Sequence, residues 1–327
     1  MRTCIVGAGA VGGLLGAKLA ASGAAQVSVL ARGATLHALR THGWRLREGG
    51  EVVSAPATAA ADPSELGPQD AVIIAVKGPS LAEVAPRIAP LLGPDTIVVP
   101  AMNGVPWWFT KGVAAVGDAP LESVDPGGAI DRAIGFGRIL GCVVHINVAT
   151  EEPGLTVHNM GRGLIVGEPR AVVSERARAF GGSLAKAGFE VTVSQDIRRD
   201  IWYKLWGNMT VNPVSAITGA TGHRILSDPL VMAFCHAAMG EAAAIGAKLG
   251  CPIAETPESR SKVTARLGDF RTSMLQDAEA GRPLELDALL GVVHELGRRV
   301  GVATPNVDAL FGLARLFGRV HGLYPAD

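Results

Sequence analysis

Six residues near the N-terminus form a glycine-rich pattern whose backbone could bind phosphate. The pattern follows a short apolar run and precedes an Ala- and Leu-rich segment of helical character. In a strand-turn-helix unit, the first glycine allows a tight turn, the second lets backbone approach a pyrophosphate, and the third permits close helix packing. Amide groups at the helix N-terminus then face the phosphate. The pattern predicts a dinucleotide site at Gly7, Ala8, Gly9, Ala10, Val11 and Gly12.

The residue after the second predicted strand indicates which dinucleotide binds. Enzymes that use NAD usually place an acidic residue there for the ribose 2′-hydroxyl, whereas this chain has Ala31 and then Arg32. A guanidinium can instead pair with the 2′-phosphate of NADP(H) through two hydrogen bonds. The alternative is an ordinary solvated arginine. We predict NADPH as the cofactor, with Arg32 at its 2′-phosphate.

Two further polar residues follow predicted parallel strands, where open α/β sheets bind ligands. Lys77 comes after one strand and could contact a phosphate or ribose of the cofactor. Asn103 comes after the next strand and offers a donor and an acceptor near the nicotinamide. A loop lysine and an ordinary Asn-Gly turn explain the same residues equally well.

The second half of the chain carries a polar stripe on an otherwise apolar helix. Lys204, Asn208 and Asn212 are spaced at i, i+4 and i+8, which places them on one helical face, and the residues around them are largely apolar. Asparagine is a weak helix former, so this stripe indicates groups that contact a ligand. Pro213 is expected to bend the helix. The alternative is an amphipathic helix whose polar side meets water.

A second polar patch lies further along the chain. It runs from Ser273 to Asp277 and is followed by Pro283 and Glu285. Glu285 is expected to open a helix, where the helix dipole stabilises a carboxylate. A glutamate in the first turn is usually structural, so its spacing alone does not make it a site residue.

The elements that must position these residues divide the chain in two. Buried parallel strands are predicted over 3–6, 26–30, 70–76 and 96–100. More strongly alternating runs predict an antiparallel extension of the same sheet over 138–148, 155–158, 164–167 and 189–193. Helical spacing replaces strand-like runs from about Asp196, notably over 229–249 and 284–300. We expect an α/β fold, with a Rossmann-type doubly wound sheet over 1–195 and an all-helical domain over 196–327.

Composition excludes several classes of protein. Lys plus Arg and Asp plus Glu each number 30, so the net charge is zero and a broad basic face for nucleic acid is not expected. Apolar residues make up 48% and charged residues 18%, which suits a folded chain. We expect no membrane-spanning segment, because the apolar runs are interrupted. The four cysteines form no pair or cluster typical of disulfides or metal, which favours the cytoplasm and no metal.

Taken together, these motifs resemble the ketopantoate reductase family. The resemblance is carried by the N-terminal glycine motif, Asn103-Gly104, the Lys204, Asn208 and Asn212-Pro213 spacing, and Ser273-Met274-Leu275-Gln276-Asp277 with Glu285 beyond it. It implies NADPH-dependent reduction of 2-dehydropantoate, a 2-oxo acid, to pantoate. A 2-oxo acid is then the small-molecule partner. The sequence leaves open whether the chain forms a homodimer.

The resemblance also implies a role for each residue. Lys204 would be the general acid, with Asn103 and Asn208 beside it and the substrate. Asn212 and Ser273 would contact polar groups of the substrate. Glu285 would contact the substrate hydroxyl or orient Lys204. These roles suit the chemistry, because hydride delivery builds negative charge on the ketone oxygen and an ammonium can stabilise and protonate it.

One segment departs from simpler members of the family. Trp107-Trp108-Phe109 and a Gly-, Pro- and Asp-rich stretch follow Asn103-Gly104. These aromatic residues either reshape the substrate pocket or form a hydrophobic plug under an insertion. The substrate could therefore be another 2-oxo acid. A non-catalytic NADP-binding sensor and an amine-dependent opine dehydrogenase are the rival functions.

Overall fold

The computed structural model describes residues 1–326, which divide into two compact units. The first comprises Met1–Met102 and Ala129–Asp200, and the second comprises Asn103–Gly128 and the chain from Ile201 onward. The predicted change to helical character near residue 196 falls close to the second junction. The sequence did not indicate that Asn103–Gly128, which interrupts the first unit, packs with the helical one.

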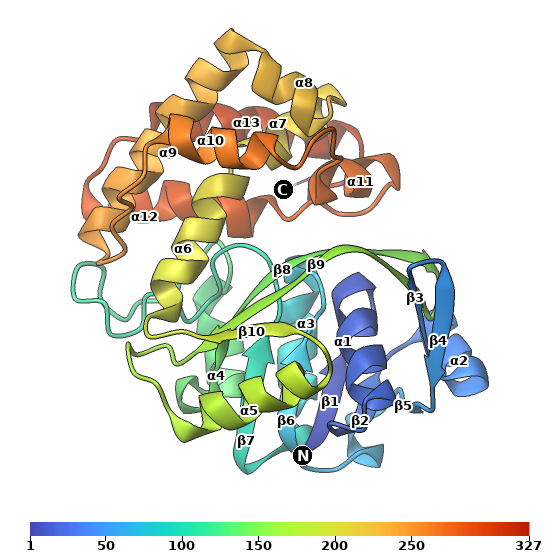
Figure 1. Ribbon diagram of the computed structural model, residues 1–327. Helices are drawn as coiled ribbons and strands as arrows, with labels where there is room; N and C mark the ends of the chain where they lie inside the picture. Colours follow the sequence, from blue (N-terminus) through green and yellow to red (C-terminus); the bar gives the residue numbers. More distant parts are fainter. Residues whose placement is uncertain (327) are drawn as a thin grey trace. The chain divides into compact units, whose positions relative to one another are not determined.

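A five-stranded parallel sheet forms the centre of the first unit (Figure 1). Its order is β5-β2-β1-β6-β7, and its strands are β1 (Arg2–Val6), β2 (Gln26–Leu30), β5 (Thr58–Ala60), β6 (Gln69–Ile74) and β7 (Leu92–Pro100). All four predicted parallel strands are present, and β5 joins them at the edge. Helices α1 (Ala10–Ala21), α2 (Gly33–His42) and α3 (Gly78–Arg87) follow β1, β2 and β6 in the chain. This confirms the Rossmann-type α/β class.

The strand order reverses between β1 and β6. From β1 the chain adds strands on one side, β2 and then β5, before β6 and β7 pair on the other. Ligands of open α/β sheets bind at such a reversal, outside the carboxyl ends of the strands. Gly7 follows β1 and Lys77 lies just beyond β6, so both lie at this point.

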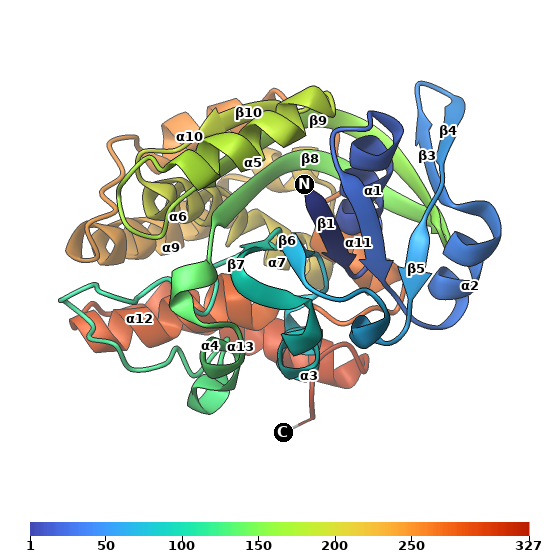
Figure 2. The same cartoon turned by 90° about the horizontal axis from the view of Figure 1, so that it is seen from below.

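A second sheet in the same unit corrects the predicted extension. Its strands are β3 (Trp44–Glu48), β4 (Glu51–Ala55), β8 (Gly141–Glu152), β9 (Leu155–Gly167) and β10 (Glu190–Val193), in the order β10-β9-β3-β4 with β8 also on β9. Figure 2 shows the long β8 and β9 running past α1. Only the pairs β8–β9 and β3–β4 are antiparallel, because β9 pairs parallel with β10 and β3. The prediction of one extended antiparallel sheet was therefore wrong.

The glycines between the predicted strands 155–158 and 164–167 lie inside one continuous strand. Gly161 has a φ of +78°, and a Cβ there would lie 2.6 Å from the carbonyl oxygen of His145. The β8–β9 register shifts between His145 and Asn147. The glycines thus form an irregularity that brings two backbones together, and no hairpin turn separates the two predicted strands.

Helix α1, which carries the glycine motif, packs closely on this second sheet. A Cβ at Gly16 would lie 2.2 Å from the buried Trp44 ring of β3, so only glycine fits there. Lys18 donates a hydrogen bond to Glu48 at 2.8 Å. Desolvation favours the neutral form of Glu48, but hydrogen bonds from Lys18 and His158 outweigh it and lower the pKa of the carboxyl to about 2. Glu48 therefore stays ionised and holds α1 in place.

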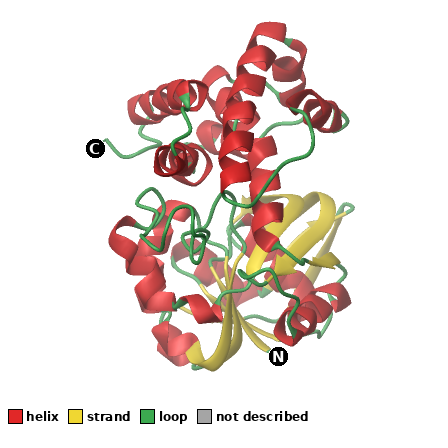
Figure 3. Cartoon of the chain, turned by 90° about the vertical axis from the view of Figure 1, so that its left-hand side faces the viewer, coloured by secondary structure: helices red, strands yellow, loops and turns green. Residues whose placement is uncertain are grey.

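Short helices complete the first unit: η1 (Pro63–Glu65), η2 (Ala89–Leu91), α4 (Ala129–Ile134), η4 (Phe136–Arg138) and α5 (Glu175–Lys186). Every described element of the second unit is helical (Figure 3). Its elements are η3 (Pro126–Gly128), α6 (Ile197–Asn208), which begins in the first unit, α7 (Val211–Thr218), α8 (Gly222–Ser227), α9 (Pro229–Lys248), α10 (Pro257–Ala265), α11 (Ser273–Glu279), η5 (Asp287–Gly291), α12 (Val292–Val300) and α13 (Pro305–Val320).

Helix α9 is long and apolar enough to cross a membrane by length and composition alone, a test that the core helix of a soluble protein also passes. Its contacts are those of a core helix. Glu241, near its middle, accepts hydrogen bonds from the amides of Asn306 and Val307 at 2.9 and 3.0 Å. These amides lie in the first turn of α13, so the carboxylate of α9 satisfies donors at the start of another helix.

Candidate active site

The glycine motif has the geometry of a phosphate-binding turn. Gly7 has a φ of +92°, and a Cβ there would lie 2.6 Å from Val76 Cγ1. A Cβ at Gly12 would lie 2.0 Å from the carbonyl oxygen of Gly7, whereas a Cβ at Gly9 would meet nothing within 4 Å. Gly7 and Gly12 are therefore required by the protein's own packing. Gly9 caps α1 without a side-chain hydrogen bond and leaves the backbone open to a ligand.

Arg32 and Lys77 lie at the same carboxyl edge of the parallel sheet. Arg32 precedes α2, and Lys77 precedes α3. The Arg32 guanidinium donates to Glu83 of α3 at 2.9 Å, and the two side chains are 67% and 55% exposed. An ion pair this exposed contributes little stability and can rearrange. Arg32 thus lies between β2 and α2, with a partner, Glu83, that the sequence did not reveal.

The polar stripe extends over two helices instead of one. Lys204 and Asn208 lie on α6, which ends at Asn208, and Asn212 lies on α7, which begins at Val211. Pro213 has no N–H, and its ring would clash with the carbonyl of the residue four positions earlier in a continuous helix. The chain therefore interrupts the helix at Met209, which places Pro213 in the first turn of α7. The predicted bend is real, but it lies before the proline.

Helix α6 is fixed by two tryptophans on the face away from this stripe. Trp202 and Trp206 are fully buried, and their indole N–H groups donate to the carbonyl oxygens of Ala242 and Met239 on α9. Lys204, Asn208 and Asn212 are all half-buried. The stripe is therefore partly accessible along α6 and α7.

The structure joins Lys204 to Asn103. The ammonium of Lys204 donates a hydrogen bond to Asn103 Oδ1 at 2.7 Å, although 101 residues separate the two in sequence. The backbone beside Asn103 is also held: the Val105 amide donates to the Ala288 carbonyl at 2.9 Å. Gly104 between them has a φ of +81°, and a Cβ there would lie 2.3 Å from that carbonyl oxygen. The Asn-Gly pair is thus a close packing point.

The Ala288 carbonyl belongs to the wide helical turn η5, a feature often found at functional sites. Burial raises the pKa of Asp287 in this turn, while the Tyr324 hydroxyl donates to its carboxylate at 2.6 Å and acts in the opposite direction. Glu285 is half-buried and lies just before the turn, outside the helix it was expected to open. Ser273 begins α11 with an exposed side chain, and Thr272 caps that helix. In residues 1–326, no hydrogen bond joins Ser273 to the stripe.

Two family models together match most of the chain. The model described as "Ketopantoate reductase PanE/ApbA" matches residues 3–171, and "Ketopantoate reductase PanE/ApbA C terminal" matches residues 196–317. The chain belongs to the ketopantoate reductase family. The resemblance seen in the sequence is confirmed, and the chain is an oxidoreductase.

Individual relatives agree with this family. A 2-dehydropantoate 2-reductase from Mesorhizobium japonicum is 46% identical over 325 residues, which cover 99% of this chain and 100% of that protein. A crystal structure from Ralstonia solanacearum, provisionally named a ketopantoate reductase, is 56% identical with a TM-score of 0.95, and covers 99% of both chains. D-mandelate dehydrogenase with NADH and anilino(oxo)acetate is 20% identical with a TM-score of 0.83, covers 99% of this chain and 100% of that chain, and shows the fold alone.

The aromatic residues that depart from simpler family members are interior residues. Trp107, Trp108 and Phe109 are 3%, 1% and 1% exposed. Phe109 stacks on Trp202, with ring centroids 5.8 Å apart. Of the two alternatives left open by the sequence, the hydrophobic plug fits this burial. The plug anchors the segment that begins at Asn103 onto α6.

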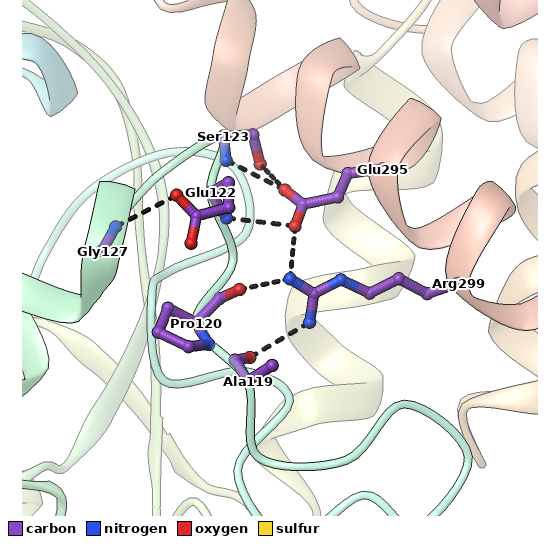
Figure 4. Close-up of polar contacts among 7 residues, drawn as sticks. All are labelled: Ala119, Pro120, Glu122, Ser123, Gly127, Glu295 and Arg299. Carbon is purple, nitrogen blue, oxygen red and sulfur yellow. Dashed lines mark hydrogen bonds and ion pairs between the residues drawn. The ribbon is translucent and has the colours of Figure 1, made fainter.

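Glu295 of α12 anchors the far end of the same segment (Figure 4). Its carboxylate accepts hydrogen bonds from the amides of Glu122 and Ser123 at 3.0 and 2.9 Å. The Ser123 hydroxyl donates to it as well, at 2.6 Å. One carboxylate therefore satisfies three donors of a loop that has no strand or long helix of its own.

Arg299 completes this attachment one helical turn later. Its guanidinium donates to the carbonyl oxygens of Ala119 and Pro120 and to Glu295. The side chains of Glu295 and Arg299 are only 17% and 20% exposed, so their interactions are largely shielded from water. Sequence reasoning missed both residues, because an i, i+4 Glu-Arg pair is typical of any solvated helix face.

Replacing Glu295 with Ala should destabilise the protein, because it removes the acceptor of three hydrogen bonds and leaves a shielded guanidinium without its carboxylate. We expect the free energy of unfolding, from urea titration of the full chain, to fall by about 2–4 kcal/mol. Glu175→Ala, at a carboxylate that is 89% exposed, is the matched control and should change it by less than about 0.5 kcal/mol. Equal effects of the two substitutions would contradict this role of Glu295.

Proposed function

We propose that this chain reduces the C2 ketone of 2-dehydropantoate to the hydroxyl of pantoate, with NADPH as the reductant. The observation that carries the proposal is the 2.7 Å contact of Lys204 with Asn103, because it joins two separate motifs of the family at one point. A relative named 2-dehydropantoate 2-reductase, which is 46% identical and matched over its full length, supports this choice of substrate.

The residues at the sheet edge suit NADPH. The open backbone at Gly9 and the uncapped start of α1 would receive the pyrophosphate, as part of the Gly7–Gly12 turn. Arg32 would hold the 2′-phosphate, and Lys77 would contact a phosphate or ribose. When bound, the nicotinamide supplies the hydride that the keto carbon receives.

Lys204 would act as the general acid. As negative charge develops on the keto oxygen, the ammonium stabilises that charge and donates one proton, and the neutral amine then recovers a proton from water. Asn103 Oδ1 accepts one of the three N–H donors of Lys204 and so limits how the ammonium can rotate. Its amide nitrogen can donate to the substrate.

The remaining residues of the site would bind the substrate. Asn208 and Asn212 present amides on the same stripe as Lys204, one and two turns further on. Ser273 would contact a polar group of the substrate with its exposed hydroxyl. Glu285 would contact the substrate hydroxyl or orient Lys204.

The direct test is oxidation of NADPH by the purified chain with 2-dehydropantoate, compared with other 2-oxo acids. Fast turnover with 2-dehydropantoate supports the proposal. Preference for another 2-oxo acid would keep the mechanism and change the substrate. Tight NADPH binding without turnover would favour the sensor function, and turnover only with an added amine would favour the opine dehydrogenase.

Lys204→Ala should lower kcat by about 100- to 10,000-fold, because it removes the proton donor. The Kd for NADPH, from fluorescence titration, should change little, since the glycine motif lies in the other unit. Lys186→Ala, at an exposed lysine in α5, controls for loss of a positive charge. Turnover near the wild-type rate in Lys204→Ala would eliminate the assigned role.

Arg32→Ala should raise the Kd for NADPH by about 10- to 100-fold and leave that for NADH nearly unchanged, because only NADPH has the 2′-phosphate. Glu83→Gln is the matched variant, since it removes the carboxylate that pairs with Arg32 and leaves the positive charge of Arg32 in place. That variant should bind NADPH at least as tightly as the wild type. If Arg32→Ala weakens both cofactors equally, Arg32 is not at the 2′-phosphate.

We also propose that the chain works as a homodimer in the cytoplasm. A ketopantoate reductase from Staphylococcus aureus with the same fold is dimeric, and all four cysteines here are free thiols. Leu313, Leu316 and Val320 are 58%, 61% and 73% exposed on α13, at a spacing that forms one helical face. Light scattering should give twice the chain mass, and Leu316→Glu should give a monomer. A monomeric wild type would contradict the dimer.

A further inference from the structure

A guanidinium from α10 lies against the helix that carries Lys204. A Cβ placed on Gly207 of α6 would lie 2.6 Å from Nη2 of Arg260, 2.8 Å from its Nε and 3.0 Å from its Cζ. Three atoms of the guanidinium at similar distances indicate that it lies flat on the helix surface at Gly207. Glycine at this position leaves the space that the guanidinium occupies.

Arg260 also lies over an aromatic ring of α6. Its Cζ is 5.2 Å from the ring centroid of Tyr203, which is within the range of a cation-π interaction. The Tyr203 hydroxyl donates to Glu255 at 3.0 Å, so the ring itself is held in place. Arg260 is thus held from two sides, by Gly207 below and by Tyr203 beside it.

The charge of Arg260 has no counterion among residues 1–326. No ion pair joins it to a carboxylate of these described residues, and its Nε is buried among them without a hydrogen-bond partner. By contrast, Arg299 and Arg282 in the same unit are each paired with a carboxylate. Partial burial of an unpaired guanidinium costs free energy, which an anionic ligand would recover.

Arg260, from α10, contacts α6 close to Lys204, the proposed proton donor. Gly207 is three residues after Lys204 and directly precedes Asn208. Side chains three and four residues apart on a helix have Cβ atoms about 5–6 Å apart, so Arg260 lies at the border of the polar stripe. The guanidinium of Arg260 therefore packs on α6 less than one helical turn from Lys204.

We propose that Arg260 binds the carboxylate of the 2-oxo acid substrate. This inference rests on the proposed function. In such a substrate the carboxylate is bonded directly to the keto carbon, so its partner must lie within about one helical turn of Lys204. Asn208, Asn212 and Ser273 are neutral, Glu285 is acidic, and Lys204 serves the ketone oxygen. Arg260 supplies the second positive charge, in a planar fork that matches a carboxylate.

Steady-state kinetics with 2-dehydropantoate and with its neutral lactone test this role. Arg260→Ala should raise KM for the acid by roughly 10- to 100-fold with a smaller change in kcat, because the contact is present before and during hydride transfer. KM for NADPH should not change. For the lactone, kcat/KM, or the inhibition constant if it is not reduced, should equal that of the wild type.

Three further variants separate a positioned contact from simple loss of charge or folding. Gly207→Ala keeps Arg260 but places a methyl group in the space of the guanidinium, so KM for the acid should again rise. Lys262→Ala, at an exposed lysine on α10, is the matched control and should behave as the wild type. Arg260→Lys keeps the charge without the fork and should give an intermediate KM.

The outcomes distinguish this inference from the proposed function. A wild type that reduces 2-dehydropantoate, together with an unchanged KM in Arg260→Ala, overturns the role of Arg260 alone. Equal losses on the acid and on the lactone also overturn it, since they indicate general damage to the site. A wild type that reduces no 2-oxo acid overturns the proposed function, and the carboxylate assignment with it.

Discussion

The hydrogen bond from Lys204 to Asn103 is the constraint on which the organisation of the helical unit depends. An ammonium on a helix meets a neutral amide from a loop that interrupts the other unit in the sequence. A carboxylate in place of Asn103 would bind the ammonium more strongly and favour its charged form, whereas an amide orients it without opposing proton release. The chain must therefore hold Asn103 by other means. Gly104, the buried aromatic plug and the carboxylate of Glu295 provide them.

Much of the fold was predictable, because local sequence specifies it. The buried strands of the parallel sheet are short runs of β-branched residues, and the glycine motif follows the first of them as expected. The second sheet was only partly foreseen. Gly161 has the same sequence signal in a hairpin turn as in a strand irregularity, and only its approach to His145 distinguishes the two. The β3–β4 hairpin had a usable signal, since alternating residues flank Gly49-Gly50.

The candidate site was predictable where it lies on one helix and unpredictable where it depends on tertiary contacts. The spacing of Lys204 and Asn208 gives their common face directly. The pairing of Lys204 with Asn103 requires knowledge that Asn103–Gly128 leaves the first unit, which no local pattern contains. Glu295 and Arg260 were missed for a related reason. A charged residue on a helix has the same sequence signal whether it faces water, a loop or a ligand.

The ion pair between Arg32 and Glu83 has a consequence for how the protein distinguishes two cofactors. If Arg32 holds the 2′-phosphate, NADPH must exchange one ion pair for another rather than create a new one. Glu83 then acts as an intramolecular competitor that lowers the gain from the phosphate. Because added salt weakens the exposed pair in the free protein as well as the contact in the complex, the preference for NADPH should respond less to ionic strength than that of an enzyme with an unpaired arginine.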